Sequence, residues 1–445
     1  MEFPPMVRIR QIFPDPRVDD IEGTVRSQIA RSRLRERLAP GARIAVAAGS
    51  RGINNIGRIV GAVIAELRTM GFEPFVVPAM GSHGGATPDG QREILASYGI
   101  APETTGAPVV SSLDVVKIGE LPNGTPVVWS RDALAADGVV IVNRVKPHTD
   151  FRGTWESGLV KMMVIGLGKQ RGAENIHQHG VRGLRDLIPQ AARVILGQGK
   201  VALGVAVVEN AYDETARVEV LPPGAIAARE PALFAQARAW MPRLPVDAID
   251  VLVVDEMGKT FSGTGMDVNV IGRWRHREVP DPPSPRVRRI VALRLADASE
   301  GNAQGVGLAD VVTRRLAEAI DFGATYLNAI VSTYLERVFL PLVAPSDRAA
   351  IAVAVRTLGL HDPAAVRIVR IPNTLHLERL WVSPAVAAEV QDVEGVTLGR
   401  TVPWRFTPAG DLEVWGPAAW EEDEGAAADA GPDAPGRSTV ADHER

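Results

Sequence analysis

The chain has 445 residues, of which 46% are hydrophobic and 23% charged, with a net charge of -4 and no cysteine. This length makes two domains the starting expectation, and the hydrophobic and charged fractions are ordinary for a folded protein with a buried core. The near-neutral balance gives no reason to expect a nucleic-acid partner, and the lack of cysteine excludes disulfides, thiolate metal ligands and cysteine nucleophiles.

The N-terminus lacks the apolar core of a signal peptide, and no stretch approaches ~20 consecutive apolar residues. We therefore expect a cytoplasmic protein with no membrane partner. Any metal must be held by histidine, by carboxylate or by atoms of a bound cofactor.

The first half of the chain alternates predicted strands and helices, which is typical of a mostly parallel sheet covered by helices. Thr87 and Pro88 have the residue types of a helix N-cap and first turn, and Asn123-Gly124 predicts a hairpin turn. The predicted strands are 43–48, 74–80, 138–142 and 201–208, with short strands within 109–128. The predicted helices are 25–38, 56–70, 88–98 and 184–196.

A second unit is predicted to begin near Asp247. Its predicted strands are 249–254 and 289–294, its predicted helices are 308–320, 324–335, 348–358 and 384–390, and 273–288 is predicted to be an exposed connection. The acidic, alanine-rich end is expected to be disordered. We therefore predict two α/β domains, 1–246 and 247–418, with the active site in the cleft between them, followed by a tail, 419–445.

Residues 143–180 contain three of the eight histidines and three of the six lysines. An apolar run, 138–142, reads as a buried strand and leads directly into this polar, glycine-rich stretch. In open α/β sheets, ligand-binding groups collect just beyond the carboxyl ends of strands. The stretch is therefore the strongest candidate for a functional site.

His83 and His148 each follow a predicted strand of the first unit. An imidazole has an ordinary pKa of ~6.5, which suits proton transfer near neutral pH. Each could instead be a structural residue, His83 as a cap of the following helix and His148 at the surface. Two histidines beyond two strands of one sheet can nevertheless face the same space, as an acid/base pair requires.

Lys161 is flanked by apolar residues, which favours partial burial and a more nucleophilic amine, although a lysine that extends to the surface is the alternative. His177 and His179 lack the spacing of a helical zinc site. One histidine that completes a metal site made mainly by a cofactor fits better, and for His179 we favour simple exposure to solvent.

In the second unit, Lys259, Asp267, Asn269 and Arg273 surround a Gly-Thr-Gly turn. Four polar groups near a strand end indicate the wall of a site, while an ordered loop held by its own side chains is the alternative. Gly166-Leu167-Gly168-Lys169 and Gly258-Lys259-Thr260 echo nucleotide-binding motifs without their full spacing.

Taken together, five short motifs resemble the nickel-pincer lactate racemase family and its wider set of 2-hydroxyacid racemases and epimerases. The resemblance covers residues 43–180 well and extends more loosely to about residue 396. The motifs are Gly49-Ser50-Arg51, Gly81-Ser82-His83, Pro147-His148, Gly158 to Lys161, and Asn175 to His177.

The resemblance implies an isomerase that uses a tethered nickel-pincer nucleotide, a pyridinium mononucleotide with two sulfur-bearing arms. It implies that Lys161 carries the cofactor through a thioamide, that His177 binds nickel, that His83 and His148 act as alternating acid and base, and that Arg51 helps hold the substrate or orient a base. The other residues expected to contact the cofactor are Gly81, Ser82, Gly84, Gly158, Lys259, Asp267 and Arg273. The implied partners are the enzymes that make and load the cofactor and a small 2-hydroxyacid. The sequence leaves the oligomeric state open, with a homo-oligomer as one alternative.

The chain departs from the family's pattern in two places. The stretch between His148 and Lys161 is a few residues longer than in lactate enzymes, and the second-domain lysine that holds the substrate carboxylate has no obvious match. Arg273 is our substitute, because a guanidinium can bind a carboxylate through two hydrogen bonds. We therefore expect a 2-hydroxyacid other than lactate. The open alternatives are a metal-dependent hydrolase or lyase that uses the histidines as direct ligands, and a non-catalytic binding protein of the same fold.

Overall fold

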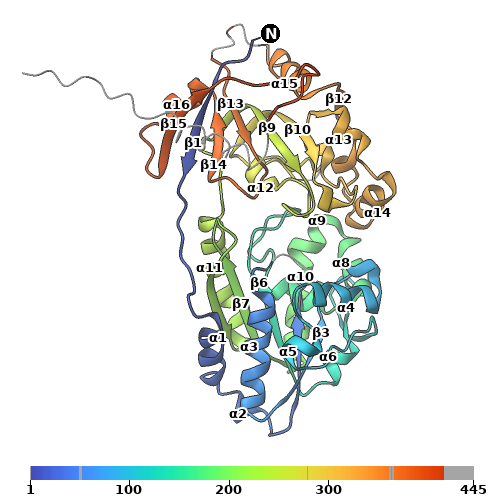
Figure 1. The fold of residues 1–445 in the computed structure, drawn as a ribbon. Coiled ribbons are helices and arrows are strands. Elements are labelled where there is room, and N and C mark those ends of the chain that lie inside the picture. The colour runs from blue at the N-terminus through green and yellow to red at the C-terminus, as the bar shows by residue number, and fades with distance from the viewer. Residues whose placement is uncertain (1, 50–52, 278, 360–361, 363–364, 415–445) are drawn as a thin grey trace, which may run out of the picture.

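The computed structural model describes residues 2–49, 53–277, 279–359, 362 and 365–414. Arg51 and the predicted tail, 419–445, lie outside the described residues. The described chain forms two units, each built around one large sheet, with the N-terminal unit in the lower half of Figure 1. The predicted α/β class with mostly parallel sheets is confirmed.

The sheet of the N-terminal unit has five strands in the order β3, β2, β6, β7, β8. These strands are β2 (Arg43–Ala48), β3 (Glu73–Pro78), β6 (Gly138–Arg144), β7 (Val201–Glu209) and β8 (Thr215–Leu221). All neighbours are parallel except β7 and β8, which are antiparallel. The buried apolar residues of β2, β6 and β7 are typical of central strands that are covered on both faces.

Helices cover both faces of this sheet, because alternate strand residues point to opposite sides. Ala45 and Ala47 belong to the core beneath α10 and α11, whereas Val46 belongs to the core beneath α1 and α3. The helices of the unit's first part are α1 (Ile21–Ala30), α2 (Leu34–Arg37), α3 (Ile56–Thr69), α4 (Pro88–Ser97), α5 (Pro102–Thr105) and α6 (Arg131–Ala135). The later helices include α10 (Ile188–Gly197) and α11 (Pro223–Trp240), and β4 (Val115–Glu120) and β5 (Pro126–Ser130) form a separate hairpin.

The C-terminal unit contains an eight-stranded sheet in the order β12, β11, β10, β9, β13, β14, β1, β15. Its first five strands in this order are mutually parallel, and the last three are antiparallel to their neighbours. The strands are β9 (Ala248–Met257), β10 (Arg286–Leu295), β11 (Val311–Thr313), β12 (Leu342–Ala344), β13 (Ile368–Ile371), β14 (Arg379–Val382) and β15 (Val396–Val402). Its helices are α12 (Val268–Ile271), α13 (Arg314–Glu318), α14 (Phe322–Ser332), α15 (Asp347–Arg356) and α16 (Pro384–Val390).

The first strand, β1 (Met6–Gln11), does not lie with the residues that follow it. It pairs with β14 and β15 in the C-terminal sheet, and the chain then runs down to α1 in the N-terminal unit. The predicted N-terminal domain of residues 1–246 therefore needs a correction at its start. The strands that pair with β1 lie within residues 379–402, far along the chain. A local sequence pattern does not reveal such a pairing.

Several predicted elements are confirmed with small shifts at their ends, among them β2, α3, β6, β9 and α16. Thr87 caps α4, since its hydroxyl accepts a hydrogen bond from the Gly90 N–H at 3.1 Å. The helix predicted at 308–320 is wrong in its first half, where β11 enters the sheet. The helix predicted at 25–38 is interrupted at Arg33, whose φ of 56° is incompatible with a continuous α-helix.

The connection predicted at 273–288 is also not uniformly exposed, because Trp274 is completely buried and β10 begins at Arg286. None of the helices among the described residues is both long and apolar enough to cross a membrane.

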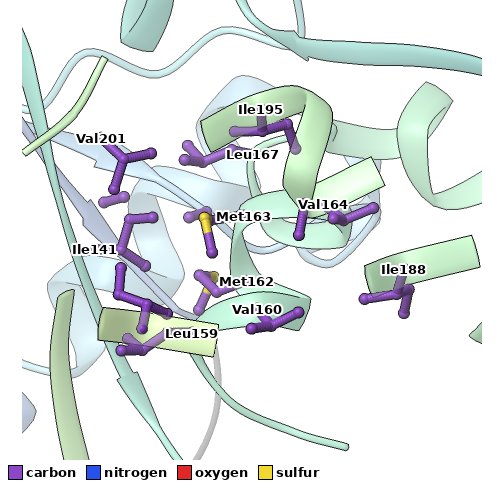
Figure 2. Close-up of a cluster of buried hydrophobic side chains, with 14 of the residues drawn as sticks. Ile141, Leu159, Val160, Met162, Met163, Val164, Leu167, Ile188, Ile195 and Val201 are labelled. Atoms are coloured by element: carbon purple, nitrogen blue, oxygen red, sulfur yellow. The ribbon is translucent and has the colours of Figure 1, made fainter. Parts of the chain in front are cut away.

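One buried segment joins the N-terminal sheet to the helices above it. α7 (Leu159–Lys161) continues into a π-helical turn, η2 (Met162–Gly166). Figure 2 shows Leu159, Met162 and Met163 packed between Ile141 of β6 and the helix that carries Ile195. Burial of these side chains fixes the backbone of Lys161, and π-helical turns occur often at functional sites.

We predict that Ile9→Ala destabilises the protein much more than Ile12→Ala. Ile9 is completely buried in the C-terminal sheet, whereas Ile12 is 61% exposed one residue beyond the same strand. Loss of the buried atoms should lower the free energy of unfolding by ~2–5 kcal/mol, and loss of the exposed ones by less than ~0.5 kcal/mol. Urea unfolding measures both values.

Hydrogen exchange locates the change. Faster exchange in β14 and β15 is expected for Ile9→Ala, and faster exchange confined to β2 and β3 would contradict the strand pairing described here.

Candidate functional site

The candidate site lies beyond the carboxyl ends of β3 and β6. These strands flank β2 in a parallel arrangement, so their loops leave the same edge of the sheet. With neighbouring strands ~4.8 Å apart, the two loops begin about 10 Å from each other. The first loop carries His83 and the second carries His148.

The loop after β6 is organised by a buried carboxylate that sequence reasoning did not single out. Glu156 is 2% exposed and accepts hydrogen bonds from the backbone N–H groups of His148, at 2.7 Å, and Gly153, at 3.2 Å. Arg152 lies 3.3 Å from the same carboxylate and also donates to the His148 carbonyl oxygen at 3.0 Å. Burial raises the pKa of Glu156, although these contacts oppose the rise. Residues of this loop thus fix the backbone of His148.

The second unit holds the same loop from the other side. The fully buried guanidinium of Arg337 forms an ion pair with Asp150 and donates to the Thr149 carbonyl oxygen at 2.9 Å. Burial alone would raise the pKa of Asp150, but the charge of Arg337 holds it far below its ordinary value. Asn269 of α12 accepts a hydrogen bond from Arg152. The candidate site therefore lies where the two units meet.

Lys161 is presented by α7, whose first turn is capped by a distant carboxylate. Glu230 of α11 is 1% exposed and accepts from the N–H groups of Leu159, at 2.6 Å, and Val160, at 3.1 Å. A Cβ atom on Gly158 would lie 2.6 Å from the Glu230 carboxyl carbon, so only glycine fits before this helix. Burial raises the pKa of Glu230 to about 7. The carboxylate satisfies N–H groups that the start of a helix leaves open.

The amine of Lys161 contacts Nε2 of His148 directly. His148 Nδ1 accepts a hydrogen bond from the Asp150 N–H at 2.9 Å, and a neutral imidazole that accepts at Nδ1 carries its proton on Nε2. Burial, followed by the charge of Lys161, lowers the pKa of His148 well below its ordinary value, which agrees with a neutral ring. Lys161, His148 and Asp150 thus form one connected group of side chains beyond the end of β6.

His177 ends α8 (Lys169–His177) and belongs to the same group of side chains. Its Nε2 atom is buried and has no hydrogen-bond partner. Burial and then the charge of Lys161 lower the pKa of His177 to about 4, and His177 in turn lowers the pKa of His148. An orphaned imidazole nitrogen that stays neutral at pH 7 is chemically suited to bind a transition metal.

The loop after β3 contacts the turn that follows Lys161. The Gly81 N–H donates to the Gly166 carbonyl oxygen at 3.3 Å. The buried side-chain amide of Gln91 donates to the carbonyl oxygens of Gly81 and His83, at 3.0 and 3.2 Å. Gly84 has a φ of +69°, and a Cβ atom there would lie 2.7 Å from the backbone nitrogen of Gln91, so the turn requires glycine.

Ser82 lies in this turn as well, and its carbonyl oxygen accepts from the Ala86 N–H at 3.1 Å. The loop that carries His83 is thus positioned by backbone contacts to α4 and to η2.

Asp267 and Lys259, two of the residues predicted from the second unit, have different environments. Asp267 caps α12, and its charge raises the pKa of both Arg144 and Arg152, against the lowering by burial, so it faces the first unit. Lys259 instead donates to the Gly263 carbonyl oxygen at 2.9 Å and contacts Asn328.

Arg273 donates to Asp310 at 2.6 Å and to the carbonyl oxygens of Leu308 and Val287, at 3.0 and 2.9 Å. Its guanidinium stabilises the C-terminal unit internally, so the structure does not support Arg273 as the substitute residue for carboxylate binding.

His179 and Lys169, which both lie within residues 143–180, have structural contacts. His179 is exposed, as expected, and its Nε2 atom lies 2.9 Å from the Thr125 hydroxyl. Lys169 is completely buried and donates to the Pro78 carbonyl oxygen at 2.5 Å, while burial lowers its pKa to about 8. The glycine-rich segment before Lys169 therefore packs against the end of β3.

Four residues that organise the candidate site were missed from the sequence. Asp150 and Glu156 stand in the predicted loop and could have been suspected, because buried loops need acceptors for their N–H groups. Glu230 and Arg337 carried no usable signal, since their partners are 70 and 187 residues away.

The fold and the site together define an α/β protein with two sheets, whose reactive side chains collect at the carboxyl edge of the first sheet. Residues 10–185 match the family model described as the lactate racemase N-terminal domain. The match confirms the predicted resemblance to this family over residues 10–185.

Two solved structures are similar to the chain, each at 13% sequence identity. The lactate racemase apoprotein from Thermoanaerobacterium thermosaccharolyticum has a TM-score of 0.47, and the match covers 82% of this chain and 99% of that one. A protein from Thermotoga maritima has a TM-score of 0.49, with 80% and 94% covered. No curated protein matches this chain.

No group of three or more His, Cys, Asp or Glu side chains is arranged to hold a metal ion in the parts of the chain that the structure describes.

We predict that Glu230→Gln changes how stability depends on pH. The pKa of Glu230 is raised to about 7, so the folded protein keeps a proton that the unfolded chain releases near pH ~4.3. The resulting stabilisation is present below the unfolded pKa and is lost as pH rises through about 7. Between pH 5 and 8 the wild type should lose up to about 3 kcal/mol relative to Glu230→Gln.

Urea unfolding at the two pH values measures this difference. Glu93→Gln, at an exposed position of α4, is the control and should leave the dependence unchanged. Parallel pH curves for wild type and Glu230→Gln would show that Glu230 titrates normally.

Proposed function

We propose that this protein is a racemase or epimerase of a 2-hydroxy carboxylic acid that uses a nickel-pincer nucleotide tethered to Lys161. The observation that carries the proposal is the contact of the Lys161 amine with His148, in the same group of side chains as a buried, unpartnered nitrogen on His177. The lactate racemase match over residues 10–185 supports it.

The residues present fit such a cofactor. Formation of a thioamide requires an unprotonated lysine amine, and Lys161 is the lysine that contacts the buried His148 beyond the end of β6. Nickel accepts imidazole ligands, and His177 offers one nitrogen that no protein group satisfies. Lys161 and His177 would therefore hold the cofactor and its metal, with the remaining metal ligands supplied by the cofactor itself.

The chemistry that the cofactor supplies when bound is reversible acceptance of the substrate α-hydrogen as hydride. The protein must supply a base for the hydroxyl proton, because removal of the α-hydrogen as hydride is easier when the hydroxyl loses its proton at the same time. The base must lie within ~3 Å of that hydroxyl.

His148 is one of the two proposed acid/base groups. The Glu156 carboxylate fixes its backbone, and the Asp150 N–H fixes the orientation of its ring through Nδ1. Proton exchange with the substrate hydroxyl would take place at Nε2, the nitrogen that contacts Lys161. A positioned base of this kind contributes ~10²–10⁴-fold to the rate.

His83 is the second acid/base group in the proposal. Its loop and that of His148 flank the end of β2, so the two histidines can address a substrate from two sides. Inversion of configuration in both directions needs a proton acceptor for each orientation of the substrate. The proposal also includes a cytoplasmic location and the cofactor-synthesis enzymes as partners. The substrate proposed is a 2-hydroxyacid other than lactate, because the longer loop after His148 lies beside the reactive groups.

We predict that Lys161→Ala abolishes covalent loading. Protein co-expressed with the cofactor-making enzymes should show a mass increment on the intact chain and bound nickel, and both should be lost in Lys161→Ala, whereas Lys117→Ala, at an exposed position of β4, should retain them. Intact-mass spectrometry and metal analysis provide the readouts. Bound metal without any mass increment would favour a hydrolase or lyase, and the absence of both would favour a binding protein.

We predict that His83→Ala and His148→Ala each reduce racemisation by at least ~10²-fold while they retain the adduct and nickel. Optical rotation of single-enantiomer 2-hydroxyacids, incubated with the loaded enzyme, measures the rate. Retained racemisation in either variant would remove that histidine from the acid/base role.

A further inference from the structure

The C-terminal unit exposes an unusual amount of apolar surface in one stretch of chain. Of twelve large hydrophobic side chains that are exposed among the described residues, nine lie between Phe322 and Val343. This stretch comprises α14, the short helix η6 (Leu335–Val338) and the edge strand β12. The concentration distinguishes it from isolated exposed hydrophobic residues, which are normal on protein surfaces.

On α14 the apolar side chains form a stripe that faces away from the protein. Phe322, Tyr326 and Ile330 are spaced four residues apart and are 44%, 48% and 65% exposed, and Leu327 beside them is 65% exposed. The opposite side of the helix is buried through Thr325 and Ala329. The apolar stripe of a surface helix ordinarily faces the protein core. The outward-facing stripe of α14 therefore indicates a contact with a partner outside the unit.

The charge distribution of residues 322–343 is compatible with contact between two copies of this surface. Residues 322–343 contain only two charged residues, Glu336 and Arg337. Both are engaged, Glu336 with Arg277 and Arg337 with Asp150. Two copies of this surface can therefore face each other without repulsion between like charges. A low number of charged residues is also typical of the centre of protein interfaces.

The area is also sufficient. Nine large apolar side chains that are 39–65% exposed present roughly 800 Å², which equals the ~800 Å² that each partner contributes to a standard stable interface. The surface lies at one end of the eight-stranded sheet, beyond β12, where α14 occupies the right-hand margin of the upper unit in Figure 1.

We propose that the surface of residues 322–343 is the contact of a two-fold symmetric dimer of this chain, with the α14 stripes of two copies packed against each other. A two-fold contact brings identical residues together near its axis. Because Arg337 belongs to the same stretch and holds Asp150 beside His148, the dimer contact adjoins the candidate site of each copy.

The absence of cysteine from the chain permits a direct test with the full-length protein. Single cysteines are introduced at Phe322, Tyr326, Leu327 and Ile330, and Leu398→Cys is the matched control, because Leu398 is 38% exposed on β15 at the opposite edge of the sheet. Under mild oxidation, at least one α14 variant should form a disulfide-linked dimer rapidly, since a disulfide needs Cβ atoms only ~3.5–4.5 Å apart. The Leu398 variant should not.

Light scattering of the wild-type chain at about 100 µM should give twice the mass of one chain. Leu327→Glu introduces two facing carboxylates into the contact and should weaken the dimer by at least ~100-fold, whereas Leu398→Glu should not. Circular dichroism checks that both variants remain folded, which is expected because both positions are exposed.

A monomeric wild type would overturn the proposal, as would a dimer that only Leu398→Glu disrupts. Cross-linking in the α14 variants no faster than in the control would do the same. A monomer that binds anionic lipid vesicles through Leu327 would instead identify the surface as a membrane contact.

Discussion

The ion pair between Asp150 and Arg337 is the contact on which the candidate site most depends. It joins the loop that carries His148 to a completely buried guanidinium of the other unit. Removal of one partner from such a pair leaves an uncompensated charge in the interior, which is far more costly than the pair itself is stabilising. The two units are therefore held in a defined relation at the place where the reactive side chains meet. Glu156 on the first unit and Asn269 on the second act in the same way through backbone and amide groups.

Within this frame, three side chains control one another's protonation. His148 accepts the Asp150 N–H at Nδ1 and contacts Lys161 through Nε2, while the buried Nε2 atom of His177 has no hydrogen-bond partner. In the proposed function, Lys161 is the point of attachment and His177 the metal ligand, and side chains that are already positioned lower the cost of binding. A structural side chain ordinarily has its polar atoms satisfied by the fold, as Lys169 does, and the Nε2 atom of His177 differs in this respect.

The sequence predicted a large part of the fold because its signals are local. The parallel strands β2 and β6 are short apolar runs, the capping residue Thr87 marks the start of α4, and the glycines at 81 and 84 mark a turn that side chains cannot enter. The parts that sequence reasoning missed depend on long-range partners. β1 needs β14 and β15, β11 is too short to show a period, and the roles of Glu230 and Arg337 exist only after folding.

The same limit applies to the candidate site. The sequence singled out His148, Lys161 and His177 because each follows a strand or lies in a motif with family-like spacing. The structure brings them into one group of side chains, and their roles stay predictions. Arg273 was chosen by residue type and sequence position alone, and its guanidinium instead satisfies carbonyl groups inside its own unit. Arginine is suited to either task, so the direction in which its side chain points had to come from the structure.

The position of β1 has a consequence for the synthesis of the protein. Residues 6–11 leave the ribosome long before their partners, because β14 and β15 are made only when residues 379–402 emerge. The N-terminal sheet can assemble in the meantime, since all five of its strands lie between residues 43 and 221. β1 therefore stays without its sheet neighbours, tethered to a unit that can already fold, until residues 379–402 have been made. Closure of the C-terminal sheet around β1 thus comes late in co-translational folding.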